Sequence, residues 1–224
     1  KKKVLVIDLD GQKNSTSILG FKDGEGETIY DFLTGKTQEV FSYSTKTKNL
    51  DYVPSSEEMR NIELNLNTRK SRERILEKFI SQVRNAYDYI LIDCPPSKGV
   101  IIDNAMTASD GIIVPIKCEM MSMQGLTEIV CEVNEVKSVL NPNLEITGFL
   151  GTMYEGRLRL NRDILNGLNA NFPGKVFKTI IRRNVSLAEF CESSQNIFEY
   201  SPSSYGAADY MNLAKEIINI NRKK

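Results

Sequence analysis

The chain has 224 residues, of which 41% are hydrophobic, so it can bury one sizeable core and is most simply a single domain. Its 29 basic and 29 acidic side chains balance, which excludes a global basic field, so any nucleic-acid binding must come from a local patch. Histidine is absent, which excludes His-based catalytic triads and His-ligated metal sites and leaves carboxylates, lysines and backbone amides for any chemistry.

Predicted strands and helices alternate along the chain. Apolar runs bounded by turn residues predict strands over residues 3–9, 50–53, 88–93, 111–116, 146–153 and 176–181. Apolar stripes and helix-start signals predict helices within residues 12–17, 28–35, 75–83, 126–140, 160–168 and 210–218. In the second of these helices, Thr28 and Asp31 have capping-box spacing and Gly35 is the predicted end. The alternation predicts an α/β fold with a doubly wound, mainly parallel sheet.

Two of the predicted strands end in aspartates. Strand 3–9 carries Asp8 and Asp10 at its carboxyl end, and Asp93 follows the aliphatic residues 90–92, which suit a strand buried on both faces. Because neighbouring parallel strands lie ~4.8 Å apart, their ends can converge on one magnesium ion and one phosphate. A single such aspartate is commonly only a cap for the next turn, but two copies favour a nucleotide-hydrolysing site.

Neither of two glycine-containing segments is a phosphate loop. Residues 35–37 read Gly-Lys-Thr, but Tyr30 stands where the motif needs its first glycine, and a predicted helix precedes it instead of a strand. Gly151 and Gly156 have the required spacing, yet the lysine and Ser/Thr that would hold the β- and γ-phosphates do not follow. The predicted site therefore has the carboxylates of nucleotide hydrolysis without a phosphate loop.

Several segments of the chain resemble the ParA/Soj-type partition ATPases, which are P-loop NTPases with a deviant Walker A loop. These segments are residues 4–12, 87–97, 114–119, 141–146, 152–154 and 176–181. They follow the family's order from Lys3 to about Ile218, so the resemblance covers nearly the whole chain. The most specific match is Asp-Cys-Pro-Pro-Ser at residues 93–97, where related MinD-type ATPases tend to differ. The resemblance implies a P-loop NTPase-like fold with three α/β/α layers.

The same resemblance implies a cycle of ATP binding and hydrolysis. The protein would bind ATP or ADP with Mg²⁺, form a homodimer around two nucleotides and bind DNA nonspecifically. A ParB-type centromere-binding protein would switch it, and it would move plasmids or chromosomes on the nucleoid in the bacterial cytoplasm. Four cysteines without a CxxC pair, and the absence of a signal peptide or of ~18 consecutive apolar residues, agree with a cytoplasmic protein.

The resemblance also implies roles for individual residues. Asp10 matches the family's catalytic carboxylate, which positions and polarises the attacking water beside the γ-phosphate. Asp93 matches the Walker B aspartate, which holds Mg²⁺ through water, and Asp8 would support the magnesium shell. The cofactor-binding residues of the implied adenine pocket are Thr152, Met153, Ile181, Arg182 and Arg183. The predicted DNA-binding residues, Arg183, Lys215 and Arg222, are basic side chains that would compensate for basic residues of the family that this chain lacks.

The sequence departs from the family in several places. The deviant Walker A loop, which in the family precedes the strand 3–9 by one helix, has no counterpart here. We therefore expect one domain over residues 1–224 that lacks the first strand, the phosphate loop and the first helix. The family's Asp-Pro-Gln-Gly-Asn is Asp-Gly-Gln-Lys-Asn at residues 10–14. Ser186 replaces an arginine of the family's DNA-contacting surface, and its spacing to Glu189 favours a capping box instead.

Two other interpretations stay open at this point. One is a nucleotide-free binding or scaffold module of the same fold. The other is a MinD-like membrane-surface positioning ATPase, which needs a basic amphipathic C-terminal helix, whereas the apolar stripe of residues 210–218 favours core packing. A membrane partner is therefore not expected. In the family, the first strand runs in the middle of the sheet, so we also expect its two neighbours to have unpaired edges. Either other residues or another chain supply the strand, or the sheet closes because the strands at Lys3 and Tyr89 pair with new neighbours.

Overall fold

The structure is a computed structural model, and it describes residues 2–96, 98–118, 123–190 and 195–222. The chain divides into two compact units. Unit 1 comprises residues 1–110 and 136–142, and unit 2 comprises residues 111–135 and 143–224. The expectation of a single domain over residues 1–224 stays a prediction.

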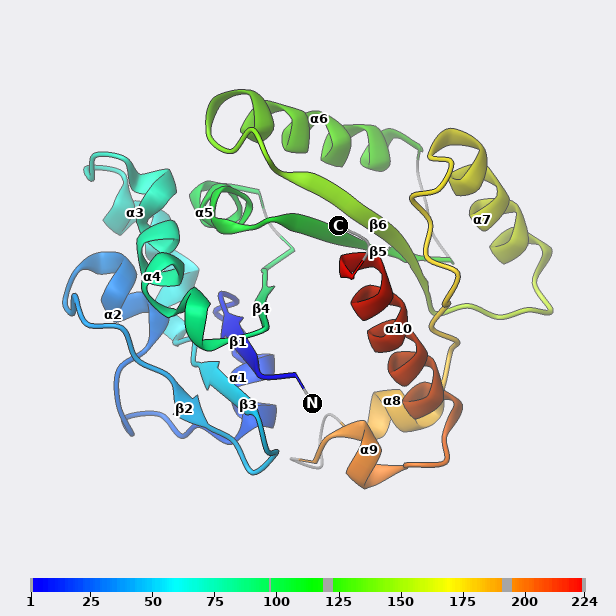
Figure 1. Cartoon of the computed structure of the whole chain (residues 1–224), viewed down its shortest axis with the longest axis horizontal. Helices are drawn as coiled ribbons and strands as arrows, with labels where there is room; N and C mark the ends of the chain where they lie inside the picture. Colours follow the sequence, from blue (N-terminus) through cyan, green and yellow to red (C-terminus); the bar gives the residue numbers. More distant parts are fainter. Residues whose placement is uncertain (1, 97, 119–122, 191–194, 223–224) are drawn as a thin grey trace. The chain divides into compact units, whose positions relative to one another are not determined.

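The sheet of unit 1 has four strands in the order β2-β3-β1-β4 (Figure 1). Strand β1 (Val4–Asp8) runs parallel to both of its neighbours, β3 (Leu50–Val53) and β4 (Tyr89–Asp93). The short strand β2 (Tyr43–Ser44) pairs antiparallel with β3. The three strands that the sequence predicts for this part of the chain are confirmed, whereas β2 is too short for its pattern to predict.

Short helices surround this sheet. They are α1 (Asn14–Leu19), α2 (Ile29–Thr34), α3 (Ile62–Leu66), α4 (Ile75–Val83) and α5 (Val100–Ala108), with the 3-10 helices η1 (Glu57–Asn61), η2 (Arg72–Arg74) and η3 (Arg84–Ala86). The predicted capping box of α2 is confirmed, since the Thr28 N–H donates to Asp31 at 2.9 Å, and Gly35 ends the helix in the left-handed conformation. The signals at both ends of α2 therefore specify it locally.

The core of unit 1 joins the sheet to its helices. Leu5 and Ile7 of β1, Leu33 of α2, and Leu76 and Phe79 of α4 are fully buried in one cluster. Burial of each such side chain contributes about 1.5–3 kcal/mol to folding. The cluster fixes β1, and with it the carboxylates that follow the strand.

The prediction that β4 is buried on both faces is wrong. Leu91 is 51% exposed, and its neighbours Ile90 and Ile92 are only half-buried. Among the described residues β4 pairs with β1 alone, so no strand covers its other edge. An aliphatic run indicates a strand, but burial on both faces also needs a partner on each side.

Unit 2 contains the parallel pair β5 (Gly111–Lys117) and β6 (Glu145–Thr152). Its helices are α7 (Arg159–Asn171), α8 (Val185–Glu189), α9 (Ile197–Tyr200) and α10 (Tyr205–Asn221), and it shares α6 (Met123–Val139) with unit 1. Phe149, Ile164 and Leu168 belong to one buried cluster that holds α7 on β6. Leu150 and Leu213 belong to a second cluster, which packs α10 against β6.

The strand predicted over residues 176–181 is wrong. This segment forms only isolated parallel bridges with β6 and its extension, Phe149 to Val176 and Tyr154 to Arg182. Between the bridges, the N–H groups of Lys178 and Thr179 donate to the Glu216 carboxylate of α10, each at 2.8 Å. A continuous ladder does not form because these two amides are bonded to a side chain instead of a strand.

The capping box predicted from Ser186 to Glu189 is also wrong. Asn184 is the N-cap of α8, and its Oδ1 accepts the Ser186 N–H at 2.8 Å. Asparagine is as good an N-cap as serine, so the helix begins at Val185 instead.

The fold class is confirmed as α/β with mainly parallel strands. The pairs β1–β3, β1–β4 and β5–β6 are parallel, and β2–β3 is antiparallel. No helix in the described part of the chain is long and apolar enough to cross a membrane. Cys94, Cys118 and Cys131 are free thiols, while Cys191 lies outside the described residues.

Candidate functional site

Asp8 anchors the turn that follows β1. It is 1% exposed, and its Oδ1 accepts the Asp10 N–H at 2.9 Å. Its Oδ2 accepts the N–H of Thr16 at 2.8 Å and the hydroxyl of Thr16 at 2.7 Å. The Thr16 oxygen in turn accepts the Ser55 N–H at 2.8 Å, which ties the start of α1 to the segment after β3. The carboxylate of Asp8 is therefore engaged inside the protein.

The burial of Asp8 changes its titration. Burial raises the pKa of Asp8 above its usual 3.8, because the charged form loses its hydration. The hydrogen bonds from Thr16 and Asp10 lower the pKa in opposition, and the charge of Asp93 raises it further. The net shift of the Asp8 pKa is upward, so the fold disfavours the charged form of this carboxylate.

Asp93 lies beside Asp8 but is exposed. The two residues are register partners at the ends of β4 and β1, and the Leu9 N–H donates to the Asp93 carbonyl at 2.8 Å. The carboxylate of Asp93 accepts the Ser15 hydroxyl at 2.5 Å, and the residue is exposed. Asp10 is half-buried two residues after Asp8, and its Oδ1 accepts the Gln12 N–H at 2.9 Å. The three predicted carboxylates of unit 1 thus meet at one edge of the sheet.

These carboxylates fit magnesium at a phosphate better than a closed metal cage. In the residues that the structure describes, no three acidic or cysteine side chains are arranged to hold a metal ion. Mg²⁺ at phosphate sites keeps several waters and takes one or two carboxylates in addition to phosphate oxygens. Asp93 has the exposure that such a role needs, whereas the oxygens of Asp8 already accept hydrogen bonds from Asp10 and Thr16.

Unit 2 contains a largely apolar cavity of about 800 Å³. It is lined by the five residues implied for the adenine pocket, namely Thr152, Met153, Ile181, Arg182 and Arg183, with further residues of 184–190 and 196–198 and Tyr210. Met153 has a left-handed backbone (φ 53°) at the end of β6 and is 45% exposed. The structure therefore brings the five together, although they come from segments about 30 residues apart.

Arg182 is held by its own unit. Its N–H and Nε donate to Oδ2 of Asp209, at 3.1 and 3.0 Å, and its Nη2 donates to Oδ1 at 2.7 Å. Its guanidinium also lies 4.1 Å from the ring centre of Tyr205. The hydrogen bonds to Asp209 raise the pKa of Arg182, so it stays charged. This fork joins the segment after residue 181 to α10 and leaves Arg182 fewer donors for a ligand.

The predicted DNA-binding residues lie on the surface of unit 2. Arg183 is exposed, and its Nη1 pairs with Glu155 at 3.0 Å. Lys215 of α10 is exposed, and so is Arg222 at the end of that helix. Arg183 also lines the cavity, so it is predicted for two roles, and it pairs with Glu155.

Sequence reasoning missed the residues that orient the carboxylates. Ser15 and Thr16 follow the aspartate-rich turn directly, so two hydroxyls at the start of a short helix were a usable signal for partners of Asp8 and Asp93. Asp209 had no such signal, because its partner Arg182 lies 27 residues away.

The comparisons with known proteins agree with this arrangement. Residues 1–146 match a family model described as an AAA domain. The chain is 38% identical over 218 residues to the sporulation initiation inhibitor protein Soj of Bacillus subtilis, covering 96% of this chain and 86% of that protein. It is 34% identical over 226 residues to the chromosome partitioning protein ParA of Caulobacter vibrioides, covering 99% of this chain and 85% of that protein.

A solved structure with a similar fold is cobyrinic acid a,c-diamide synthase from Mycobacterium smegmatis with bound ATP analog and magnesium. It has a TM-score of 0.83 and 27% identity, with 97% of this chain and 82% of that chain covered. Parallel strands that end in carboxylates, with this likeness, define an α/β domain of the P-loop ATPase class. Within that class, the identities above show that the chain belongs to the ParA/Soj family of partition ATPases.

Proposed function

We propose that this chain is the ATPase domain of a partition protein that binds ATP or ADP with Mg²⁺ and hydrolyses ATP slowly. The observation that carries the proposal is the register pairing of Asp8 with Asp93 at the ends of β1 and β4. It places the exposed carboxylate of Asp93 and the half-buried carboxylate of Asp10 at the same edge of the sheet. Open α/β sheets bind ligands at the carboxyl ends of their strands. The names of the relatives, chromosome partitioning ParA and Soj, support the same assignment.

Asp10 is the proposed catalytic residue. A catalytic carboxylate must be held at a fixed place beside the phosphate, whether it takes a proton from the attacking water or only accepts a hydrogen bond from it. The Gln12 N–H donates to one oxygen of Asp10, and the residue is only half-buried. Asp10 therefore acts on water and not on the anchoring of the phosphates.

Asp93 is the proposed magnesium residue. When bound, the ion neutralises charge on the phosphate oxygens and orients them for displacement. Asp93 would hold it through water, with Ser15 fixing the carboxylate from the side of α1. Asp8 supports the magnesium shell only indirectly in this proposal, because its own oxygens hold the turn that carries Asp10.

The cavity of unit 2 is the proposed place for the adenine base. Its lining is mainly apolar, as flat aromatic ligands require, and Thr152 supplies a polar group at its rim. Ile181 is buried and Met153 is half-exposed, so both offer apolar contacts. Arg182 and Arg183 contribute chiefly by shaping the rim, since each already has an acidic partner.

The proposal extends to partners and location. Bound nucleotide would favour a homodimer, and Arg183, Lys215 and Arg222 would contact DNA without sequence preference through its phosphates. A ParB-type centromere-binding protein would then trigger hydrolysis and release from the nucleoid. The support is the family and the exposure of these side chains, and the expected compartment is the bacterial cytoplasm.

The test is ATP turnover by the full-length protein with Mg²⁺ and with EDTA, together with DNA binding in ATP and in ADP. Slow turnover that needs Mg²⁺, with DNA binding favoured by ATP, is the expected result. If the protein neither hydrolyses nor binds ATP, the scaffold interpretation is correct instead. Sedimentation with anionic vesicles in ATP would point to the membrane-surface interpretation, which the burial of Leu213 within α10 disfavours.

A further inference from the structure

The turn between Asp10 and α1 decides where the proposed catalytic carboxylate lies. The Lys13 N–H donates to the Asp10 carbonyl at 3.0 Å, and the Gln12 N–H donates to the Asp10 side chain at 2.9 Å. Both N–H groups that fix Asp10 thus belong to a turn of three residues, 11–13. Anything that holds this turn also holds the carboxylate of Asp10.

Lys13 occupies this turn in a conformation that lysine rarely adopts. Its backbone is left-handed (φ 59°, ψ 30°), which costs a non-glycine residue free energy of about 1 kcal/mol. Such a conformation persists only where the surroundings determine it. The side chain is only 13% exposed although lysine usually extends into water, so its contacts are the determining surroundings.

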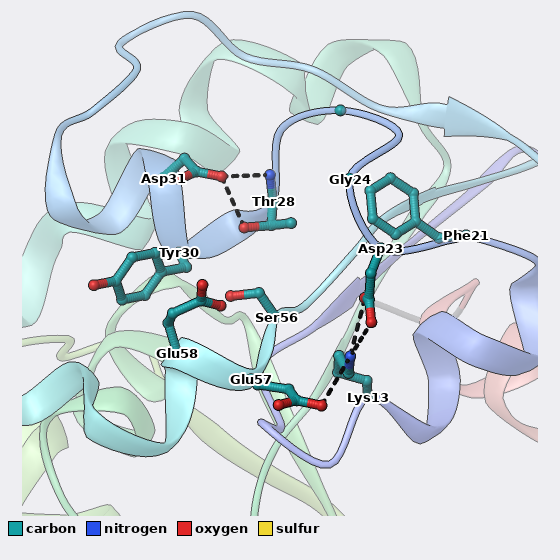
Figure 2. Close-up of a pocket in the computed structure, with 11 residues that line it drawn as sticks. Lys13, Phe21, Asp23, Gly24, Thr28, Tyr30, Asp31, Ser56, Glu57 and Glu58 are labelled. Carbon is teal, nitrogen blue, oxygen red and sulfur yellow. Dashed lines mark hydrogen bonds and ion pairs between the residues drawn. The ribbon is translucent and has the colours of Figure 1, made fainter.

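The ammonium of Lys13 joins three segments of unit 1. Its Nζ lies 2.8 and 2.9 Å from the two carboxylate oxygens of Asp23, in the loop over residues 20–27. It also lies 3.5 Å from Oε1 of Glu57, at the start of η1. Figure 2 shows the ammonium between these two carboxylates, with Asp23 and Glu57 approaching from different parts of the chain.

The helix η1 touches the same turn a second time. Nη2 of Arg60 donates to the side-chain oxygen of Gln12 at 3.2 Å. A Cβ placed on Gly11 would lie 2.6 Å from Cγ and 2.9 Å from the backbone nitrogen of Arg60, so the backbone of η1 rests directly on the turn. Two residues of η1 therefore hold the turn over residues 11–13, Glu57 through Lys13 and Arg60 through Gln12.

The outer side of this arrangement faces water. Lys13, Asp23 and Glu57 line a cavity of about 330 Å³ together with Asp31 and Glu58 (Figure 2). Asp23 and Glu57 are 75% and 68% exposed, so their attraction to Lys13 is partly screened.

We propose that Lys13 is a positioning residue for ATP hydrolysis, which it serves by fastening the Asp10 turn to η1 and to the 20–27 loop. This inference rests on the proposed function, because it takes Asp10 as the residue that positions water. Loss of the ion pairs would let residues 11–13 shift and would move the carboxylate of Asp10 away from the attacking water. A displacement of ~1 Å is enough to slow such a step greatly.

The test compares Lys13→Met with Lys36→Met in the full-length protein. Methionine keeps the unbranched side chain as far as Cε and removes the charged ammonium. Lys36 is the control because it pairs with Asp31, which lines the same cavity, and not with Asp23 or Glu57. We expect Lys13→Met to lower kcat by roughly 10-fold or more with an unchanged KM for ATP. Lys36→Met should leave both constants as in the wild type.

Exchanging the charges of Lys13 and Asp23 distinguishes a positioning role of Lys13 from a general effect on folding. Lys13→Asp should lower kcat, and the double variant Lys13→Asp with Asp23→Lys should restore most of it, because the pair is rebuilt with its charges exchanged. Aspartate also tolerates the left-handed backbone better than lysine. If Lys13→Met fails to fold, Asp23→Asn is the milder variant, since it removes one carboxylate and leaves Glu57.

Hydrogen exchange of the peptide over residues 8–18 gives a readout that does not need turnover. The amides of Gln12 and Lys13 should exchange roughly 5-fold faster in Lys13→Met than in Lys36→Met. Unchanged exchange, or unchanged kcat in a wild type that hydrolyses ATP, would overturn the positioning role. Absence of turnover in the wild type would overturn the proposed function, while the exchange rates would still decide whether Lys13 holds the turn.

Discussion

Asp8 and Asp93 are register partners at the carboxyl ends of adjacent parallel strands, yet they differ completely in exposure. Asp8 is buried and its two oxygens accept three hydrogen bonds, whereas Asp93 is exposed and accepts one from Ser15. One strand end thus supplies a structural carboxylate and the other supplies a carboxylate that is free to meet a ligand. Both carboxylates accept hydrogen bonds from α1, Asp8 from Thr16 and Asp93 from Ser15, but only Asp8 is buried.

Replacing Asp8 by asparagine should destabilise the protein. The amide nitrogen of Asn cannot accept a hydrogen bond, so the N–H of Thr16 or of Asp10 would lose its acceptor, at a cost of about 1–3 kcal/mol. Asp93→Asn is the matched control and should change stability by less than about 0.5 kcal/mol, because that side chain is exposed. Urea unfolding of both variants measures the difference, and equal losses would contradict the structural role of Asp8.

The pH dependence of that difference has a definite sign. The folded pKa of Asp8 lies above its usual 3.8, so between the two values the folded state binds more protons than the unfolded state. The contribution of Asp8 to stability is therefore greatest below pH 3.8 and decreases as the pH rises through the folded pKa. The stability of wild type minus that of Asp8→Asn should fall with rising pH in this window, and a rise would be inconsistent with the burial.

Replacing Arg182 by alanine should destabilise unit 2. Asp209 is 5% exposed and would lose the two side-chain donors of Arg182, keeping only the backbone N–H. Hydrogen bonds to a charged group are worth about 1.5–3 kcal/mol. Arg183→Ala should cost less than about 1 kcal/mol, because its pair with Glu155 is exposed on both sides. Denaturation curves with equal midpoints for the two variants would rule out this stabilising role of the Arg182–Asp209 hydrogen bonds.

DNA binding should be weak and sensitive to salt. Each phosphate contact contributes a slope of about −0.9 to log K against log salt, so Lys215→Ala should reduce the magnitude of the slope by about 1. Lys36→Ala on unit 1 is the control, since Lys36 already pairs with Asp31 at 3.2 Å. Fluorescence anisotropy with a short duplex measures the slope, and a wild-type slope near zero would favour the scaffold interpretation.

Much of the fold follows from local signals. The aliphatic runs before Asp8 and Asp93 predict β1 and β4 because a buried strand needs consecutive apolar side chains, and the capping box at Thr28 places α2 correctly. The convergence of the two carboxylates also follows, because parallel strands end at the same edge. These features depend on residues close together in sequence or on a general rule of sheet geometry.

The features that the sequence does not predict depend on distant partners. The failure of the strand at 176–181 results from Glu216, which lies 37 or more residues from the amides that it binds. The exposure of Leu91 results from the absence of a second strand beside β4 in the described part of the chain. The grip of Glu57 and Arg60 on residues 11–13 likewise joins segments more than 40 residues apart.

The unpaired strand edges lead to a prediction about folding. Among the described strands, β4 pairs only with β1 and β5 pairs only with β6. An unpaired strand edge presents a row of N–H and C=O groups that can pair with another chain. A chain of these 224 residues should therefore associate through its free strand edges and give no cooperative melt as a monomer. Sedimentation and calorimetry test this, and a sharp monomeric transition would show that the edges need no further strand.

The most direct test of the hydrolysis site is Asp10→Ala in the full-length protein, measured for both ATP binding and ATP turnover. Asp10 acts on water in this account, and among the described residues its side chain accepts the Gln12 N–H. ATP affinity should therefore stay within about 3-fold of the wild type, while turnover should fall by 10²-fold or more. Normal turnover by this variant, with wild-type affinity, would contradict the assignment of Asp10 and with it the proposed site.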